Sequence, residues 1–219
     1  SILPILYGFY ISFLPKNQIL NGEIISFSMT LKNYQEILAL PQFFISLSNS
    51  FIASFLTTII SLIVGTITAF ALTRIPYTGG DKMAFFILVF RMLPGIVLIV
   101  PSFLLFKKLD LLDTIFSLIL LYLTFSLPLA VWSLRGFLVS LPKDLDEASA
   151  LDGCNQLEVI WYIIIPIMRP ALLSTGLIVF MFCWNDFLFA LIVTDQKALT
   201  FLPYLTRFIL PNETLYGQI

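Results

Sequence analysis

Long runs without a charged residue are the feature of this sequence that most limits its fold. Phe43–Thr73 and Thr114–Leu134 contain no Asp, Glu, Lys or Arg, and Met83–Phe106 and Pro170–Thr194 contain one charged residue each. About 20 helical residues, each rising 1.5 Å, cross the ~30 Å hydrocarbon core of a bilayer. Only 11% of the residues are charged, whereas a soluble domain has about a quarter. The sequence therefore predicts an integral membrane protein with helical spans.

Two shorter apolar segments complete the predicted membrane region. Ser1–Leu14 is uncharged but short, and we interpret it as the tail of a span cut off at its start. Val159–Met168 is too short to cross a bilayer, and Pro166 and Pro170 bracket Arg169 at its end, where they disfavour a straight helix. We expect that segment to lie at the membrane surface and to bend into the last span. The predicted fold class is all-α, a polytopic transmembrane bundle with five visible spans.

The residue types present argue against several classes of function. The chain has no histidine, and Cys154 and Cys183 do not form a CxxC motif, so we expect no metal, cofactor or redox centre. A net charge of −1 gives no basic footprint for nucleic acid. A phosphate-binding GxxxxGK[ST] loop is absent from the sequence, so we expect no catalytic residues for ATP hydrolysis. A membrane-embedded enzyme is the less favoured alternative, because carboxylates do not cluster at membrane depth.

Residues 135–169 form the longest segment that is polar in its first half, and its pattern predicts a short helix. Pro142 suits the first helical turn, where a missing N–H group costs nothing. Acidic residues follow, where the helix dipole favours negative charge. Apolar residues recur at spacings of three and four and make one narrow stripe. The acidic residues are Asp144, Asp146 and Glu147, and the stripe consists of Leu141, Leu145, Ala148 and Leu151.

A turn and a second helix are predicted directly after this helix. Gly153 stands where a left-handed C-terminal cap is expected. Asn155-Gln-Leu-Glu158 has the form of a capping box, which can start a helix. Taken alone, these signals favour a well-capped, solvated loop between two spans, because runs of charge usually are solvated faces.

The spacing within this segment resembles the EAA loop of the permease subunits of binding-protein-dependent ABC importers. The family pattern is Glu-Ala-Ala, three residues, Gly, nine residues, Ile, one residue and Leu-Pro. This chain has Glu147-Ala148-Ser149, Gly153, Ile163 and Ile165-Pro166 at the same spacing, with Ser149 in place of Ala and Ile165 in place of Leu. The resemblance implies that 142–166 is a cytoplasmic coupling loop that docks on an ATPase subunit. The implied coupling residues are Leu145, Glu147, Ala148, Ser149, Leu151, Gly153, Ile163 and Pro166.

Further segments resemble the carbohydrate group of this family, and in particular the maltose-type permease that has six spans and no large periplasmic domain. They are Lys32-Asn33-Tyr34, Met92–Val97 with Pro101, Leu134–Phe137, Leu141–Glu147 and Trp184–Leu191. The resemblance implies a single transmembrane domain over 1–219, incomplete at both ends, with a sixth span beyond Ile219. Lys and Arg divide almost evenly between the two sets of loops, so charge bias gives no orientation. The resemblance places the EAA loop in the cytoplasm and 195–219 outside.

The resemblance also implies a function and a set of partners. The chain is expected to be a multi-pass protein of a bacterial or archaeal cytoplasmic membrane that moves an oligosaccharide, a disaccharide or a related polyol. Its expected partners are a second permease subunit in a heterodimer, two ATPase subunits and an extracellular solute-binding protein. A permease for a non-sugar solute such as glycerol phosphate is the alternative, because glycerol-phosphate importers share the Trp184–Leu191 element.

Three other predictions concern the spans and the last segment. Trp184, Asn185 and Asp186 either line the sugar pathway or fix helix packing through hydrogen bonds, with the structural role favoured slightly. By resemblance, the external loop contacts the solute-binding protein; a plain connector is the alternative. Arg91 is expected to snorkel toward the cytoplasmic interface or to pair with a partner subunit, in preference to contacting the substrate. The expected binding-protein contacts are Tyr204, Arg207 and Asn212, and bends are expected at Pro94 and Pro101.

Overall fold

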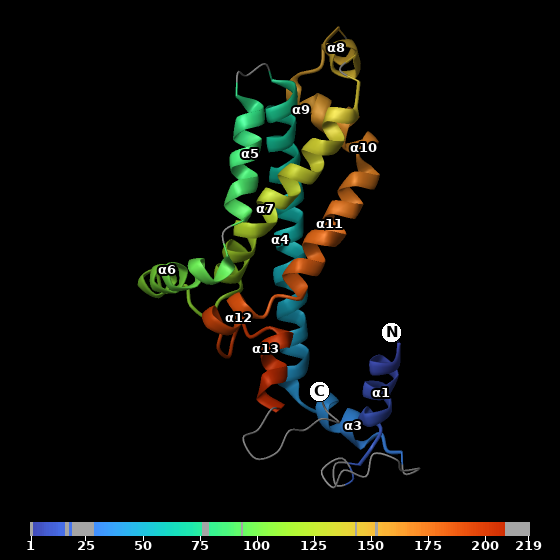
Figure 1. Ribbon diagram of the computed structural model, residues 1–219, viewed down its shortest axis with the longest axis vertical. Coiled ribbons are helices and arrows are strands. Elements are labelled where there is room, and N and C mark those ends of the chain that lie inside the picture. Colours follow the sequence, from blue (N-terminus) through green and yellow to red (C-terminus); the bar gives the residue numbers. More distant parts are fainter. Residues whose placement is uncertain are drawn as a thin grey trace.

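The computed structural model describes residues 2–15, 18, 29–75, 79–92, 94–142, 144–151 and 153–208. In this part of the chain every regular element is a helix, and the helices form an elongated bundle (Figure 1). The predicted all-α class is therefore confirmed. Two helices are long and apolar enough to cross a membrane, and two bent helix pairs bring the total to four spans if each pair is counted as one.

Helices α4 (Pro41–Arg74) and α7 (Ile115–Ser140) form the centre of the bundle. They cover the two uncharged segments, as predicted. Small residues let their backbones come close, which is how membrane helices pack when burial of apolar surface gives little driving force. The Ser61 and Ser126 hydroxyls are 2.8 Å apart, and a Cβ atom added to Gly65 would lie 3.0 Å from the Cβ of Ala130.

The predicted span over Met83–Phe106 is not one straight helix. Helix α5 (Gly80–Arg91) and helix α6 (Gly95–Lys108) meet at an angle of 84°. Pro94 lies directly before α6. Because proline has no N–H group to donate, the helical hydrogen bonds of α5 cannot continue through it. Helix α6 turns away from the axis of α4 and α7 (Figure 1). The bend at Pro94 is confirmed, whereas α6 continues through Pro101.

The segment before the last span bends as predicted. Helix α8 (Asp144–Leu151) is followed by α9 (Gln156–Glu158), the π-helix η1 (Val159–Ile164) and α10 (Ile165–Ile167). Helix α11 (Arg169–Trp184) leaves this stretch at 82°. The bend falls at Met168, between the two prolines that predicted it.

The prediction of one continuous helix over Pro170–Thr194 is wrong. Helix α11 ends at Trp184, and a separate helix, α12 (Leu188–Val193), follows. The Asn185 side chain donates to the carbonyl of Met181 at 2.7 Å, and the Asp186 carboxylate accepts from the N–H group of Ala190 at 3.1 Å. Asn and Asp side chains compete in this way with the helical hydrogen bonds.

Two apolar clusters lie toward opposite ends of α7. One joins Leu134 and Leu138 of α7 to Phe70 of α4 and to Ile164 and Met168. The other gathers Leu118 and Tyr122 of α7 with Val179, Cys183 and Phe189. The first cluster anchors the segment that follows α8, and the second anchors the break between α11 and α12.

Four short helices lie at the end of the bundle opposite α8 (Figure 1). They are α1 (Leu3–Ser12), α3 (Lys32–Leu38), α13 (Phe201–Leu205) and the 3₁₀ helix η2 (Thr206–Phe208). The amide of Asn33 donates to the carbonyls of Ser12 and Leu14, at 2.9 Å each. Asn33, in the segment that resembles the family, thus ties α3 to the end of α1.

Candidate functional site

Helix α8 projects from one end of the bundle (Figure 1). It begins at Asp144, after Pro142, and so confirms the predicted short helix with a slightly later start. Ala148 is exposed, and 91% of the Leu151 side chain is accessible. Ser149 is buried, and its hydroxyl donates to the carbonyl of Leu145 within the same helix. Serine therefore replaces the family's alanine without leaving a polar group unpaired.

The turn after α8 has the predicted geometry. Gly153 has φ = +86°, a left-handed conformation that favours glycine. The N–H group of Cys154 donates to the carbonyl of Ser149 at 3.1 Å and closes the end of the helix. Asn155 accepts from the N–H group of Glu158 at 3.0 Å, and Glu158 accepts from the N–H group of Asn155 at 2.7 Å. The capping box is therefore confirmed.

A π-helix connects this turn to the core. The N–H group of Ile165 donates to the carbonyl of Ile160, five positions back, as in a π turn. Pro166 follows and cannot donate a helical hydrogen bond. Ile163 is half-buried and Pro166 is exposed, whereas Ile164 is fully buried, as is Met168 further along. The residues that anchor this segment in the core are thus Ile164 and Met168, which lie next to or near the predicted Ile163 and Pro166 in sequence.

The end of α4 is tied to α8 through Arg74. Its Nε atom lies 2.7 Å from Oδ2 of Asp146 on α8. Its Nη2 atom donates to the carbonyl of Leu141, the residue after α7, at 3.1 Å. The side chains of Arg74 and Asp146 are 5% and 20% exposed. One guanidinium therefore joins the ends of α4 and α7 to α8.

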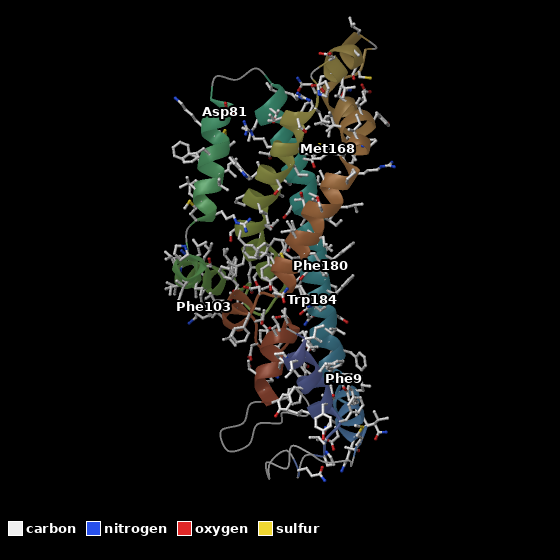
Figure 2. The ribbon with its side chains drawn as sticks, turned by 45° about the vertical axis from the view of Figure 1, so that its right-hand side comes forward. Phe9, Asp81, Phe103, Met168, Phe180 and Trp184 are labelled. Carbon is white, nitrogen blue, oxygen red and sulfur yellow. The ribbon has the colours of Figure 1, made fainter. Side chains whose placement is uncertain are left out.

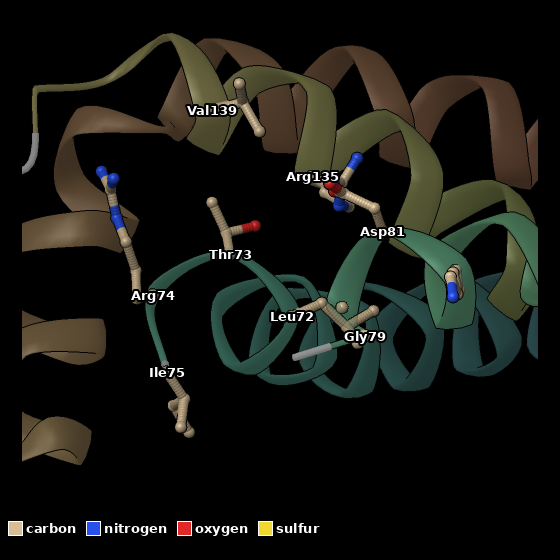
Figure 3. Close-up of a pocket in the computed structure, with 10 residues that line it drawn as sticks. Leu72, Thr73, Arg74, Ile75, Gly79, Asp81, Arg135 and Val139 are labelled. Carbon is tan, nitrogen blue, oxygen red and sulfur yellow. The ribbon is translucent and has the colours of Figure 1, made fainter. Parts of the chain in front are cut away.

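A pocket of about 600 Å³ opens at the same end, beside the start of α5. Arg135 of α7 and Asp81 of α5 form an ion pair on one side of it, and Arg74 lies on the other side (Figure 3). Gly79 has φ = +152°, and a Cβ atom on Gly80 would lie 2.7 Å from the carbonyl oxygen of Leu72. The two glycines therefore permit the turn at the start of α5 and a close approach of α5 to α4.

Trp184, Asn185 and Asp186 lie about midway along the molecule. The Trp184 ring stacks on Phe180 at a centroid distance of 5.7 Å, and both rings lie on α11 (Figure 2). Asn185 is exposed. The Asp186 carboxylate caps α12 and interacts with the hydroxyl of buried Tyr122. The structure therefore gives Asp186 internal partners, while Trp184 and Asn185 present accessible surface at a break between helices.

Residues 194–208, hereafter the 194–208 segment, close the end opposite α8. Asp113, with φ = +56°, accepts from four successive backbone N–H groups at 2.9 to 3.2 Å. Those donors belong to Asp195, Gln196, Lys197 and Ala198. Partial burial acts to raise the pKa of Asp113, but the four donors outweigh it, so the pKa lies below its ordinary value. The carboxylate therefore stays charged and holds the loop.

Helix α4 holds the same segment from the other side. The amide of Asn49 donates to the carbonyls of Lys197 and Leu199 at 2.9 and 3.0 Å, and the Ser50 hydroxyl accepts from the N–H group of Phe201 at 2.8 Å. Both residues are buried. The segment is therefore fixed through its backbone.

The predicted binding-protein contacts differ in accessibility. Tyr204 is buried and packs edge-on against Phe208. Arg207 is exposed and donates to the carbonyl of Asp195 at 2.9 Å. Asn212 lies outside the described residues. Of the two described residues, Arg207 is the one whose side chain is accessible.

Arg91 does not lie at the α8 end of α5. It is the last residue of that helix, and its guanidinium lies 5.3 Å from the centre of the Phe182 ring of α11. A cation over an aromatic face is attracted by the ring quadrupole. The prediction of snorkelling toward the cytoplasmic interface is therefore wrong, because Arg91 turns inward to α11.

The family match decides what this arrangement is. Residues 78–215, more than half of the chain, match the model of the binding-protein-dependent transport system inner membrane component. The chain belongs to this family. It is therefore a multi-pass inner-membrane permease subunit of an ABC importer, as the EAA spacing predicted.

Individual relatives support the family over most of the chain. The trehalose transport system permease protein SugB of Mycobacterium tuberculosis is 34% identical over 90% of this chain and 72% of its own length. The trehalose/maltose transport system permease protein MalG of Thermococcus litoralis is 34% identical over 91% and 73%. The diacetylchitobiose uptake system permease protein DasC of Streptomyces coelicolor is 26% identical over 99% and 78%.

A solved structure supports the fold of the permease. A chain in the crystal structure of a bacterial ABC transporter involved in the import of the acidic polysaccharide alginate superposes with a TM-score of 0.79. The match covers 99% of this chain and 83% of that one, at 22% identity. The chain thus shares its overall fold with a chain of that transporter.

Sequence reasoning located the loop of this permease but missed several of its anchors. Ile164 and Met168 continue from Ile160 at helical spacing, which is a signal that the apolar run contained. Arg74 was detectable as a cation directly after a long uncharged span. The pairing of Arg74 with Asp146 had no local signal, because the two residues come together only in the folded chain.

Proposed function

We propose that this permease imports a disaccharide, an oligosaccharide or a related polyol. It pairs with a second permease subunit, receives its solute from an extracellular binding protein, and is driven by two ATPase subunits on which all ATP hydrolysis takes place. The names of the relatives support the sugar, since they specify trehalose, maltose and diacetylchitobiose.

The observation that carries the coupling role is the asymmetry of the 142–166 loop. Its first helix, α8, is exposed, and Leu151 extends almost entirely into solvent. Its last part, η1, buries Val159, Ile160 and Ile164 in a cluster with residues of α4 and α7. A partner that binds α8 on the cytoplasmic side therefore moves the 142–166 loop, and the far end of this loop, η1, is packed in the core of the membrane domain. Exposed apolar residues flanked by polar ones are typical of such docking sites.

The break between α11 and α12 is the part of the structure best suited to the sugar path. Irregular backbone at membrane depth is tolerated where it is buried in protein or lines a water-filled cavity. Trp184 offers a flat aromatic face and Asn185 an amide, and a sugar presents apolar faces and hydroxyl groups that match them. Asp186 holds α12 and acts structurally.

Uptake by the complete complex in proteoliposomes tests the substrate. We expect ATP-dependent uptake of labelled trehalose, maltose or a chito-oligosaccharide, and only when the binding protein is present. Uptake of glycerol phosphate in place of every sugar would establish the alternative. A Trp184→Ala variant is expected to reduce sugar uptake more than an Asp186→Asn variant with equal assembly, because the carboxylate serves α12.

Photo-crosslinking of the assembled complex tests the docking site. A benzophenone amino acid at Ala148 or Leu151 is expected to crosslink to the ATPase subunit. The same probe at exposed Lys107, at the end of α6, serves as the control, because α6 lies away from α8 (Figure 1). Crosslinks from Lys107 but not from α8 would contradict the assignment.

A further inference from the structure

We propose that Arg74 is a positioning residue that links α8 to α4, and that α4 carries the motion of α8 to the 194–208 segment. This inference rests on the proposed coupling role of the 142–166 loop. The first part of the evidence is the site of Arg74. Its buried guanidinium reaches α8 through Asp146 and the end of α7 through the carbonyl of Leu141.

The second part of the evidence is the small number of polar contacts between α8 and the rest of the bundle. Among the described side chains, Arg74 and Asp146 form the only ion pair between α8 and a membrane-spanning helix. The hydroxyl of Ser149 is satisfied within α8 itself. The left-handed turn at Gly153 then separates α8 from η1. A displacement of α8 therefore acts on α4 through this guanidinium, in parallel with the path through η1.

The third part is the continuity of α4. Its 34 residues form one unbroken helix, which spans about 50 Å at 1.5 Å per residue. Arg74 is its last residue, whereas Asn49 and Ser50, near its start, hold the backbone of the 194–208 segment. One rigid element thus contacts both the loop proposed to meet the ATPase and the segment proposed to meet the binding protein.

The structure offers a matched control for this ion pair. Arg135 and Asp81 also form an arginine–carboxylate pair at the α8 end of the bundle, but they join α7 to α5 and do not touch α8. Asp81 is 92% exposed. An Asp81→Asn variant therefore removes a similar charge at the same end of the molecule and leaves the proposed link intact.

The experiment measures sugar uptake and ATP hydrolysis together in the reconstituted full complex. The Asp146→Asn and Arg74→Gln variants are expected to assemble and hydrolyse ATP, but to import at least about fivefold less sugar per ATP, the lower range of a typical coupling energy. Asp81→Asn is expected to stay within about twofold, because the Asp81 carboxylate is 92% exposed and a solvated charge contributes little to an ion pair. A loss of uptake and hydrolysis in equal proportion would indicate a structural role and overturn the inference.

Two further outcomes also decide the matter. Arg74 is more buried than Asp146, so Asp146→Asn is the variant better able to assemble; if it too fails to assemble, the pair is structural and the inference fails. An equal fall in uptake per ATP for Asp81→Asn would show a general charge effect, and the inference would again fail. Wild-type complex that imports no sugar would instead refute the proposed function, which separates the two claims.

Discussion

The two ends of this permease are held in different ways. At one end, Asp113, Asn49 and Ser50 bind the backbone of the 194–208 segment directly, with seven hydrogen bonds between them. At the other end, the ion pair between Arg74 and Asp146 is the one that joins α8 to the spans among the described side chains. Bonds to the backbone fix the path of a loop, whereas a side-chain pair lets a helix move as a unit.

This difference indicates which end of the molecule can change conformation when partners bind. The 194–208 segment presents a surface whose shape is set by α4 and by the loop that carries Asp113. Helix α8 is followed by a turn at Gly153 and keeps its own hydrogen bonds whichever way it moves. We therefore expect α8 to move when partners act, and the 194–208 segment to follow α4 as a unit with its backbone hydrogen bonds intact.

The largest expected effect comes from breaking the anchor behind α8. Ile164→Ala removes a fully buried side chain and should cost about 2–5 kcal/mol of stability, the range for large-to-small changes in a packed core. Ile163→Ala, at a half-buried neighbour, should cost clearly less. Thermal unfolding of the purified complex measures both. An equal loss for the two variants would mean that η1 is not anchored through Ile164.

The next largest effect is expected from removing the hydrogen bonds of Asp113 at the opposite end of the molecule. Asp113→Ala leaves four backbone N–H groups without their acceptor and places alanine at φ = +56°. We expect a loss of about 2–3 kcal/mol, in the range measured for hydrogen bonds to a charged group. Asp113→Asn should cost less, because asparagine tolerates this conformation and keeps one acceptor oxygen. Thermal unfolding with increased proteolysis at 194–208 checks the order, and a larger loss for Asn would contradict it.

A smaller effect is expected at the turn after α8. Gly153→Ala forces a Cβ atom into a left-handed conformation, which costs about 1–2 kcal/mol. No neighbouring atom lies within 4 Å of that Cβ position, so the cost is conformational and not steric. Uptake should fall while the 194–208 segment stays protected from protease. Loss of protection there would contradict this expectation, because it would mean that the hydrogen bonds of that segment depend on the turn after α8.

The smallest effect is a dependence on pH. Because the folded pKa of Asp113 is lowered, its contribution to stability is complete above the ordinary carboxyl pKa of about 3.9 and is lost as the pH falls toward the lowered value. The difference in melting temperature between wild type and Asp113→Asn should therefore be constant from pH 5 to 7 and shrink below about pH 4. A difference that grows in acid would contradict the assigned role.

Much of the fold was predictable because its signals are local. Uncharged runs predicted the spans, and adjacent residues predicted the helix over 144–151, the turn at Gly153 and the capping box at Asn155. The bends at Pro94 and at Met168 followed from proline chemistry. Each of these features depends on residues that are neighbours in sequence.

The remaining features depend on partners that are distant in sequence. Asp113 meets its four donors across more than 80 positions, and Arg74 meets Asp146 only after α4 and α7 have packed. The break at Asn185 was missed because the surrounding residues are as apolar as a continuous span. Hydrophobicity indicates membrane depth, but it does not show whether a helix continues.

Hydrogen exchange of the permease complex in nanodiscs, with and without its ATPase subunits, tests the central claim most directly. Backbone amides of α8 and its turn, residues 144–158, should exchange at least about tenfold more slowly when the ATPase is bound, because docking covers an exposed helix. Amides of the 194–208 segment should exchange at the same rate in both states. Unchanged exchange in α8, or protection confined to the 194–208 segment, would contradict the assignment of α8 as the coupling helix.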